Sequence, residues 1–351
     1  MDGKMIALVK NAPEPGAMEI TELPIPQIKD DEVLMEIKAV GICGTDHSLY
    51  KWNEAIANSY NIQYPNAIFG HEFSGVIAEL GANAPKNLKV GDRVTANPVL
   101  YCNTCSYCDK GQVNICDNRP FYGTDLPGAF AKYMAIRAEN IIKMPDEVTF
   151  EQGALIEPLC VAINAVDRVN PQMGDTCVVM GPGPIGLLMV AVLKQARGIG
   201  KVIVTGLAND AERLKVAESL GAITVNGSEC NVIERVLELT GGKGAECIFD
   251  AAGHFTVIQQ AIEMVAKDGR IGVTGLPAQP STIPMTPIAM RQITIIGNRA
   301  YERKNWRQAL NMLANGLDVD FAITGPRPLT DWQTSMDMLD RCEGMRHILI
   351  P

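Results

Sequence analysis

A glycine-rich turn between a strand and a helix constrains the fold of this chain most. Thr176–Met180 has the apolar character of a buried strand, and Ile185–Ala196 that of an apolar helix. The residues between them, Gly181-Pro182-Gly183-Pro184-Ile185-Gly186, have the spacing G-x-G-x-x-G. Glycines so spaced permit a tight turn and let the backbone approach a pyrophosphate at the start of the helix. The motif alone is weak evidence, but between a strand and a helix it predicts a dinucleotide-binding unit.

Strands and helices continue to alternate after this turn. The strand-like runs and helical stretches are, in chain order, Val202–Thr205, Asp210–Leu220 (helical), Cys247–Asp250, His254–Ala266 (helical), Arg270–Thr274 and Ile293–Gly297. This alternation predicts βαβ units and a doubly wound parallel sheet of the Rossmann type.

Residues 1–150 follow a different pattern. Short apolar runs at Val33–Ile37, Phe73–Ala78, Arg93–Ala96 and Phe130–Met134 are separated by Gly, Pro and Asn, which favours an irregular antiparallel domain or barrel. Two late helices are expected at 305–315 and 331–342. The predicted fold class is therefore α/β, with a β-rich domain beside the Rossmann sheet.

The second Rossmann strand lacks the acidic residue that commonly bonds the ribose of NAD. Gly206 occupies that place. The missing carboxylate also removes repulsion against the 2′-phosphate of NADP, which Arg213 is placed to reach unless it simply lies in solvent. Asp210 would replace the carboxylate if the loop folded back. The sequence leaves NAD and NADP open.

Four of the ten cysteines form a cluster with the spacing C-x2-C-x2-C-x7-C, namely Cys102, Cys105, Cys108 and Cys116. Two-residue gaps let neighbouring thiolates surround one ion, and four sulfur ligands leave no open position, so the cluster predicts a structural zinc. Four ordinary buried cysteines and an iron–sulfur cluster are the alternatives. The polar surroundings disfavour the first, and nothing else in the sequence indicates electron transfer.

Further ligand types are dispersed along the chain. Cys43 lies in the turn Gly41–Asp46, His71 and Glu72 follow a loop, and Glu157 is embedded in apolar residues. A buried carboxylate is costly unless it is paired or bound to metal. Each residue alone is more often part of a core or a surface. Together they indicate a catalytic zinc, which needs about three protein ligands and an open position.

Composition excludes other classes of function. The formal charge of the 351 residues is −9, from 31 basic and 40 acidic side chains, so nucleic acid is not an expected partner. Apolar residues make up 47%, yet no uninterrupted run reaches the roughly 18–20 residues of a membrane span. The N-terminus lacks the features of a signal peptide, so we expect a cytoplasmic protein without a membrane partner.

The ordered motifs resemble those of the zinc-containing medium-chain dehydrogenase/reductase family over essentially the whole chain. The matching elements are GICGTD at Gly41–Asp46, GHEFSG at Gly70–Gly75, VGDRV at Val90–Val94, the four-cysteine lobe, GPGPIG at Gly181–Gly186 and DAAG at Asp250–Gly253. The branch with a glutamate in an EP motif, here Glu157-Pro158, contains the polyol (sorbitol-like) and threonine dehydrogenases.

The resemblance implies a GroES-like catalytic domain, residues 1–150 and 296–351, with the structural zinc lobe at about 98–118, and a Rossmann domain at 151–295. It implies that Cys43, His71 and Glu157 surround the catalytic zinc, with Glu72 as a direct or exchangeable ligand. It also implies Ala252 at the cofactor site and a homotetramer or dimer.

The activity implied is hydride transfer between a secondary alcohol and NAD(P). Zinc would lower the pKa of the substrate hydroxyl, and Thr45 would accept the proton. Relatives commonly carry a histidine five residues after the catalytic cysteine, but here Ser48 stands there and His47 precedes it. The relay therefore runs through Thr45 and Ser48, or His47 reaches it by a local shift.

The substrate stays open among polyols, polyol phosphates and threonine-like alcohols. Arg299, Arg303 and Lys304 around Tyr301 would meet a phosphate or carboxylate, or form a solvated basic patch, and Tyr50, Trp52 and Phe121 would wall the pocket or merely pack. The rival functions are a zinc-free quinone-reductase-like activity, which Cys43, His71 and Glu157 disfavour, and a non-enzymatic NAD(P)-binding redox sensor.

Overall fold

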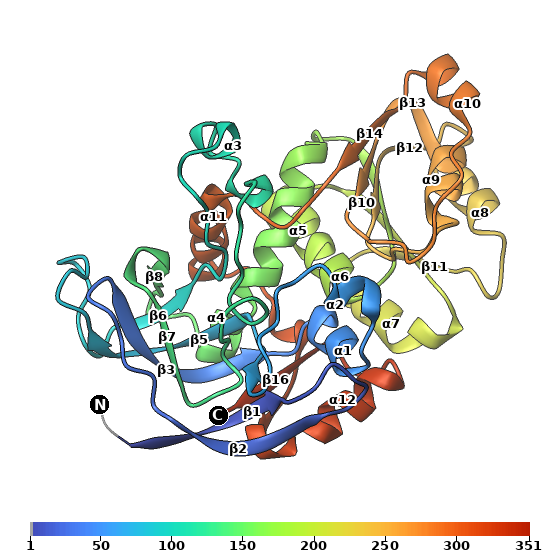
Figure 1. The fold of residues 1–351 in the computed structure, drawn as a ribbon. Coiled ribbons are helices and arrows are strands. Elements are labelled where there is room, and N and C mark those ends of the chain that lie inside the picture. Colours follow the sequence, from blue (N-terminus) through green and yellow to red (C-terminus); the bar gives the residue numbers. More distant parts are fainter. Residues whose placement is uncertain (1–2) are drawn as a thin grey trace. The chain divides into compact units, whose positions relative to one another are not determined.

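The structure is a computed structural model that describes residues 3–351 (Figure 1). The chain forms two compact units. Residues 3–157 and 323–351 form the first, and residues 158–322 form the second. In the part of the chain that the structure describes, no helix is both long and apolar enough to cross a membrane.

The first unit is built on a seven-stranded sheet of order β15-β16-β3-β5-β6-β8, in which β7 also pairs with β3, and on a three-stranded sheet β2-β1-β4. Its strands are β1 (Lys4–Lys10), β2 (Met18–Pro24), β3 (Glu32–Gly41), β4 (Ala67–Ile68), β5 (Glu72–Leu80), β6 (Arg93–Ala96), β7 (Tyr133–Arg137), β8 (Ile141–Lys143), β15 (Ile323–Pro328) and β16 (Arg346–Ile350). Its helices are α1 (Gly44–Tyr50), α2 (Glu54–Ala57), α3 (Ser106–Asp109), α4 (Phe150–Ala154) and α12 (Trp332–Asp340).

The strand register of the first unit brings distant motifs together. Strands β3 and β5 pair antiparallel from Val33 opposite Leu80 to Gly41 opposite Glu72. Strand β16 pairs with the same end of β3, with Ile348 opposite Gly41. Because Cys43 comes two residues after the end of β3, the turn that carries it lies beside the start of β5 and the start of β16.

The second unit contains a six-stranded sheet in which every neighbouring pair is parallel. Its order is β11-β10-β9-β12-β13-β14. Numbered from β9 this is 3-2-1-4-5-6, the doubly wound order of dinucleotide-binding sheets, and it confirms the predicted Rossmann sheet. The strands are β9 (Thr176–Met180), β10 (Lys201–Gly206), β11 (Ile223–Asn226), β12 (Ala245–Asp250), β13 (Val265–Val273) and β14 (Thr294–Gly297).

The helices that connect these strands alternate with them along the chain. They are α5 (Ile156–Val169), which begins at the end of the first unit, α6 (Pro184–Ala191), α7 (Ala211–Ser219), α8 (Val232–Leu239), α9 (Val257–Met264), α10 (Met285–Arg291) and α11 (Arg303–Ala314). Helix α6 continues as a short π-helical segment, Val192–Ala196. The core beneath them is formed by apolar side chains such as Val178, Ile203, Ile248 and Ile271.

Some element boundaries differ from the expectations. Strand β7 begins at Tyr133, because residues 130–132 form only an isolated bridge and loop contacts. Helix α9 ends at Met264, and the following strand β13 takes over two residues that were predicted to be helical. Apolar residues of high β propensity, such as Val265, suit a buried strand as well as a helix, so the apolar pattern alone did not locate the change.

The division into units also falls later than the resemblance implied, at 157/158 and 322/323 instead of 150/151 and 295/296. Residues 296–322 pack on the second unit because their polar groups bond there. The Asn164 side chain donates to Asn298 Oδ1 at 3.0 Å, and the Gln308 side chain donates to Asp167 at 3.1 Å. Asp318 N donates to the Gln195 side chain at 3.0 Å.

Candidate active site

Cys43 is held at the start of helix α1 by the backbone around it. It is the residue that precedes the first turn, and its backbone N–H donates to Asp46 Oδ2 at 2.8 Å. The preceding Ile42 donates its N–H to the His347 carbonyl at 2.9 Å and accepts a hydrogen bond from Arg346 at 3.1 Å. Both ends of the turn are thus fixed, one by α1 and one by strand β16.

His71 and Glu72 follow Gly70, whose φ of +90° favours glycine. A side chain at Gly70 would also collide with the Phe130 ring, 2.6 Å from the position of a Cβ. His71 and Glu72 are both buried, and the His71 ring lies 5.0 Å from the Phe121 ring. Gly41, opposite Glu72, has no room for a side chain either, because the Glu72 carboxylate lies 2.6 Å from its Cβ position.

Cys43, His71 and Glu72 each present a ligand atom, and these atoms lie within 4.8 Å of one another. His71 Nδ1 and both carboxylate oxygens of Glu72 are buried without a hydrogen-bond partner. Orphaned buried polar atoms are costly, and a cation between them would remove that cost. One thiolate, one imidazole and one carboxylate are ligand types that zinc prefers, so the donor set fits zinc.

The charges around His71 are those of a cation site. His71 Nδ1 lies 3.7 Å from Asp46 Oδ1, and the other Asp46 oxygen is bonded to Cys43 N. Burial raises the pKa of Asp46, while His71 opposes that rise. Burial by itself would lower the pKa of His71, but Asp46 and Cys43 outweigh it and raise the pKa well above its usual range. A buried positive charge is therefore favoured at this point.

Arg346 is the basic residue of this cluster. Its Nε lies 3.1 Å from Glu72 Oε2, an ion pair that lacks the alignment of a hydrogen bond. Glu157 is buried nearby, and its charge acts on both His71 and Arg346. Glu157 is not a member of the group of mutually close ligand atoms, so of the two candidate carboxylates this conformation brings Glu72 to Cys43 and His71.

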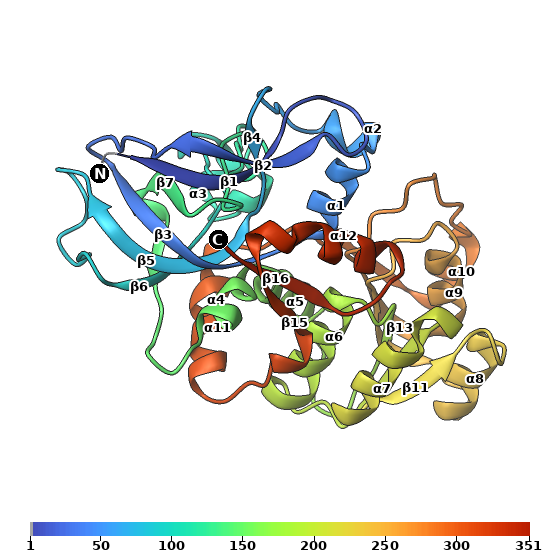
Figure 2. The same cartoon turned by 90° about the horizontal axis from the view of Figure 1, so that it is seen from below.

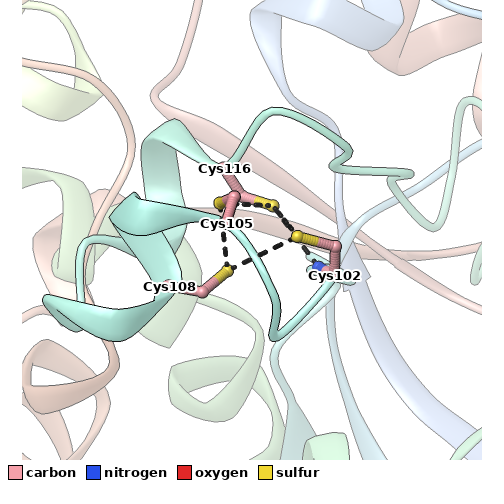
Figure 3. Close-up of side chains that lie close together, drawn as sticks. All are labelled: Cys102, Cys105, Cys108 and Cys116. Atoms are coloured by element: carbon pink, nitrogen blue, oxygen red, sulfur yellow. Dashed lines mark hydrogen bonds between the residues drawn. The ribbon is translucent and has the colours of Figure 1, made fainter.

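The four lobe cysteines converge on one point (Figure 3). Their sulfur atoms are separated by 3.5 Å (Cys102–Cys116), 3.6 Å (Cys105–Cys108), 3.8 Å (Cys105–Cys116) and 4.0 Å (Cys102–Cys108). Zinc–sulfur bonds of about 2.3 Å at tetrahedral angles place the sulfurs about 3.8 Å apart. All four thiols are free of disulfides, and their arrangement fits a closed zinc site.

The glycine-rich turn has the geometry that a dinucleotide needs. Gly181 has a φ of +100°, and a Cβ there would lie 2.9 Å from Ala252. Gly183 precedes helix α6 with open space around it, and Pro184 is the first helical residue, followed by Ile185. A Cβ at Gly186 would lie 2.0 Å from the Gly181 carbonyl, so the helix packs closely on the turn.

The Asp210 side chain lies close to the end of strand β10. Asp210 accepts a hydrogen bond from Leu207 N at 3.0 Å, and its Cβ lies 3.2 Å from the Cβ position of Gly206. Arg213 approaches Asp210 at 3.7 Å. The loop therefore does fold back, and Asp210 stands beside the place where Gly206 lacks an acid.

Of the residues that the sequence suggests for substrate contact, one lies against a zinc-ligand candidate and the others contact different side chains. Phe121 contacts His71, whereas Tyr50 packs on Trp332 and Trp52 on Tyr64. Tyr301 is buried against Trp306, and Lys304 pairs with Glu302 at 3.0 Å.

Three residues of these sites had no role predicted from the sequence. Asp46 and Asp250 lie inside two of the family motifs, and the signal that could have identified them is an acidic residue among glycines and apolar residues. Asp250 is buried and accepts hydrogen bonds from Ala252 N and Gly253 N, both at 3.0 Å, which shapes the turn against Gly181. Arg346 gave no local signal, because its partners lie about 300 residues earlier.

Comparison with protein-family models assigns both units. Residues 29–146 match the alcohol dehydrogenase GroES-like domain, and residues 184–315 match the zinc-binding dehydrogenase domain. The chain is 35% identical to D-arabitol-phosphate dehydrogenase of Enterococcus avium, over 96% of this chain and 95% of that protein. The chain belongs to the zinc-containing medium-chain dehydrogenase/reductase family. Within it, the relatives define the polyol and threonine dehydrogenase branch.

Other members of this family also match most of the chain. L-threonine 3-dehydrogenase of Bacillus velezensis is 35% identical over the full length of both proteins, and sorbitol dehydrogenase of Bacillus subtilis is 36% identical over 91% of this chain and 90% of that protein. An alcohol dehydrogenase of Escherichia coli CFT073, solved with NADH, superposes with a TM-score of 0.90 at 28% identity, with 99% of each chain covered.

A protein of Sinorhizobium meliloti 1021, assigned as a zinc-binding dehydrogenase and bound to NADP, gives a TM-score of 0.90 at 26% identity, over 99% of this chain and all of that one. This medium-chain dehydrogenase is thus an oxidoreductase that uses zinc and NAD(P) to transfer hydride from a secondary alcohol.

Proposed function

We propose that the alcohol oxidised by this dehydrogenase is a polyol or a polyol phosphate, with threonine as the second candidate. The relatives act, by their names, on D-arabitol phosphate, sorbitol and threonine. The observation that carries the alcohol chemistry is the buried cluster of Cys43, His71 and Glu72, whose imidazole nitrogen and carboxylate oxygens lack hydrogen bonds. Such a cluster suits a metal that binds an alcohol oxygen, and neither a zinc-free reductase nor a sensor needs it.

Each residue of the cluster has a proposed part in the reaction. Zinc, when bound, supplies Lewis acidity that lowers the pKa of the substrate hydroxyl. Cys43, His71 and one of the carboxylates Glu72 and Glu157 would hold it, which would leave one position open for the substrate oxygen. Asp46 orients His71 through its carboxylate, and Arg346 limits how far Glu72 can move. Thr45, on the first turn of α1, accepts the hydroxyl proton.

A substrate screen tests this proposal. Purified protein with its zinc content measured would be mixed with NAD or NADP and with sorbitol, D-arabitol, their phosphates or threonine, and reduction would be followed at the nicotinamide absorbance band. We expect reduction with at least one polyol or polyol phosphate, and its loss when the zinc is chelated. A protein that carries two zinc ions per chain and oxidises no polyol or polyol phosphate in the panel would contradict the proposed substrate class.

We propose that NAD is preferred to NADP, because the Asp210 carboxylate beside Gly206 repels a 2′-phosphate and pairs with Arg213. Asp210→Asn retains an acceptor for Leu207 N and removes the negative charge beside Arg213. The ratio of kcat/KM for NADP to that for NAD is expected to rise on the order of tenfold. This factor corresponds to about 1.4 kcal/mol, which is less than the Coulomb energy of two charges about 5 Å apart near a protein surface.

The control for this variant is Glu212→Gln in the first turn of α7, because the Glu212 carboxylate pairs with Lys215 at 2.7 Å. Its cofactor ratio is expected to stay at the wild-type value. An Asp210→Asn variant whose ratio matches that of Glu212→Gln would remove Asp210 from cofactor selection.

We propose that the dehydrogenase is a homo-oligomer that associates through the β14 edge of its parallel sheet. Strand β14 pairs only with β13 among the described residues, and an unpaired edge invites a second strand. Large apolar side chains are exposed on the segment between these strands, with Leu276 83% and Met290 79% accessible. Apolar surface beside an unpaired edge suits a second copy of the same chain.

Leu276→Asp with Met290→Glu is expected to lower the mass in solution to that of a monomer, because it places charges in the proposed interface. Analytical ultracentrifugation measures this directly. Met173→Asp, at an equally exposed methionine of the loop before β9, is the matched control and should keep the wild-type mass. A wild-type protein that sediments as a 38.0 kDa monomer would refute the interface.

We also place this dehydrogenase in the cytoplasm, since its ten cysteines are all free and a reducing compartment maintains such thiols. Cell fractionation tests that location.

A further inference from the structure

A carboxylate of the C-terminal segment binds two side chains at helix α1, which begins directly after the zinc-ligand candidate Cys43. Figure 2 shows helix α12 near the C-terminus. Asp340 is the last residue of α12. One of its oxygens lies 2.8 Å from His47 Nε2, and the other accepts a hydrogen bond from Lys51 Nζ at 2.5 Å. His47 lies on α1, and Lys51 follows its last residue. Side chains four residues apart share a helix face, so one carboxylate spans both.

The preferences of residues at helix ends do not explain why an acidic residue, Asp340, ends α12. The carboxyl end of a helix carries a partial negative charge, which disfavours another negative group there. The two basic partners from α1 offset that cost. They lower the pKa of Asp340, chiefly through the hydrogen bond from Lys51 and then through His47. The position of Asp340 is thus explained by its contacts with α1.

Helix α12 is itself firmly anchored. Met336 is buried in the core of the first unit, and the Trp332 ring packs edge-on against Tyr50 at 5.6 Å. Tyr50 is the last residue of α1. Helix α1 is therefore attached to α12 by an aromatic contact and by the two basic side chains on Asp340.

The other faces of α1 lie toward the candidate zinc site. Asp46 and Leu49 are buried, and Asp46 bonds Cys43 N and Gly70 N. Successive residues of a helix differ by about 100°, so Thr45 and Ser48 lie about 60° apart, whereas Thr45 and His47 lie about 160° apart. The helix is regular over Gly44–Tyr50, without the local shift that would bring His47 to Thr45.

We propose that Asp340 is a positioning residue that holds α1 through His47 and Lys51. We further propose that the proton passes from Thr45 to Ser48, each hydroxyl giving up its own proton as it accepts one, and leaves to solvent at the partly exposed Ser48 and not through His47. This inference rests on the proposed function. The charged groups that face His47 are Asp340 and Lys51, with Asp337 also acting on Lys51. With its Nε2 bonded to Asp340, His47 serves the site by fixing the orientation of Cys43 and Thr45.

The first test measures the attachment without any turnover. Asp340→Asn and His47→Asn are compared with Glu343→Gln, which removes an exposed carboxylate whose partner is Arg341. In the zinc-loaded protein without substrate or cofactor, the two former variants should exchange the amide hydrogens of residues 44–51 faster than wild type, and the control should not. Because they break the same contact, the double variant should exchange no faster than the faster single variant. Asp340→Asn with wild-type exchange would overturn the attachment.

The second test measures catalysis at a temperature at which every variant is fully folded. Asp340→Asn and His47→Asn are expected to lower kcat on the order of tenfold with KM unchanged, since a small displacement of reacting groups can cost up to about 100-fold. The midpoints of the kcat pH profile should not move for either. Ser48→Ala should both lower kcat and change that profile.

A His47→Asn enzyme that loses one limb of its pH profile and regains activity with added imidazole would overturn the proposed proton path. The hydrogen-exchange result remains valid even if no alcohol in the panel is oxidised, so failure of the proposed function and failure of the attachment can be told apart.

Discussion

Replacement of Cys43 by serine is expected to abolish alcohol oxidation by this dehydrogenase while leaving NAD(P) binding measurable. Serine keeps the size of the side chain, but its hydroxyl stays protonated near neutral pH and is a poor zinc ligand. The loss of turnover should exceed the roughly 10- to 100-fold that loss of an outer partner of a metal ligand costs. The cofactor turn at Gly181–Gly186 lies in the other compact unit and keeps its own hydrogen bonds.

Three measurements check this expectation. Zinc content should fall by one ion per chain, the kcat for the best polyol should fall below detection, and the fluorescence titration with NADH should still saturate. Cys342→Ser alters an exposed cysteine of the same unit and should behave as wild type. A Cys43→Ser enzyme with full turnover would remove Cys43 from the catalytic site and the proposed mechanism with it.

Replacement of Cys105 by serine is expected to unfold the lobe around the four cysteines. Only Val113, Asn114 and Cys116 are buried between residues 102 and 116, so the lobe has almost no apolar core of its own. Structural zinc contributes about 10–16 kcal/mol to folding in small zinc-binding peptides. Loss of one of four sulfur ligands therefore removes most of what holds this segment together.

The Cys105→Ser protein should contain one zinc fewer per chain, lose several degrees of thermal stability and become sensitive to proteases within residues 98–118. Ser106→Ala, a substitution at an exposed neighbour in the same lobe, is the control and should show none of these effects. Unchanged zinc content and unchanged melting temperature in Cys105→Ser would show that the cluster does not hold a structural ion.

The sequence predicted the architecture because its strongest signals are local. The glycine-rich turn and the four cysteines each lie within about fifteen residues, so their spacing already limits how the backbone can fold around a pyrophosphate or an ion. The alternation after Gly174 likewise predicted the parallel sheet that the structure confirms. The resemblance added the branch of the family, which the comparisons also support.

Contacts between distant segments were not predictable in this way. The choice between Glu72 and Glu157 depends on side-chain positions set by the pairing of β3, β5 and β16, and Arg346 joins the cluster only because β16 lies beside Gly41. The assignment of residues 296–322 to the second unit depended on side-chain hydrogen bonds to Asn164, Asp167 and Gln195. None of these contacts leaves a periodic or spaced pattern in the sequence.

By itself, then, the sequence determined the ligand types, the phosphate turn and the fold class, since each follows from residues that are near one another in the chain. The tertiary structure decided which carboxylate meets Cys43 and His71, and which side chain His47 binds. His47 and Asp340 are 293 positions apart, and only the return of the chain through α12 brings them together. A contact that depends on the whole path of the chain carries no local signature, so it becomes visible only when the fold is known.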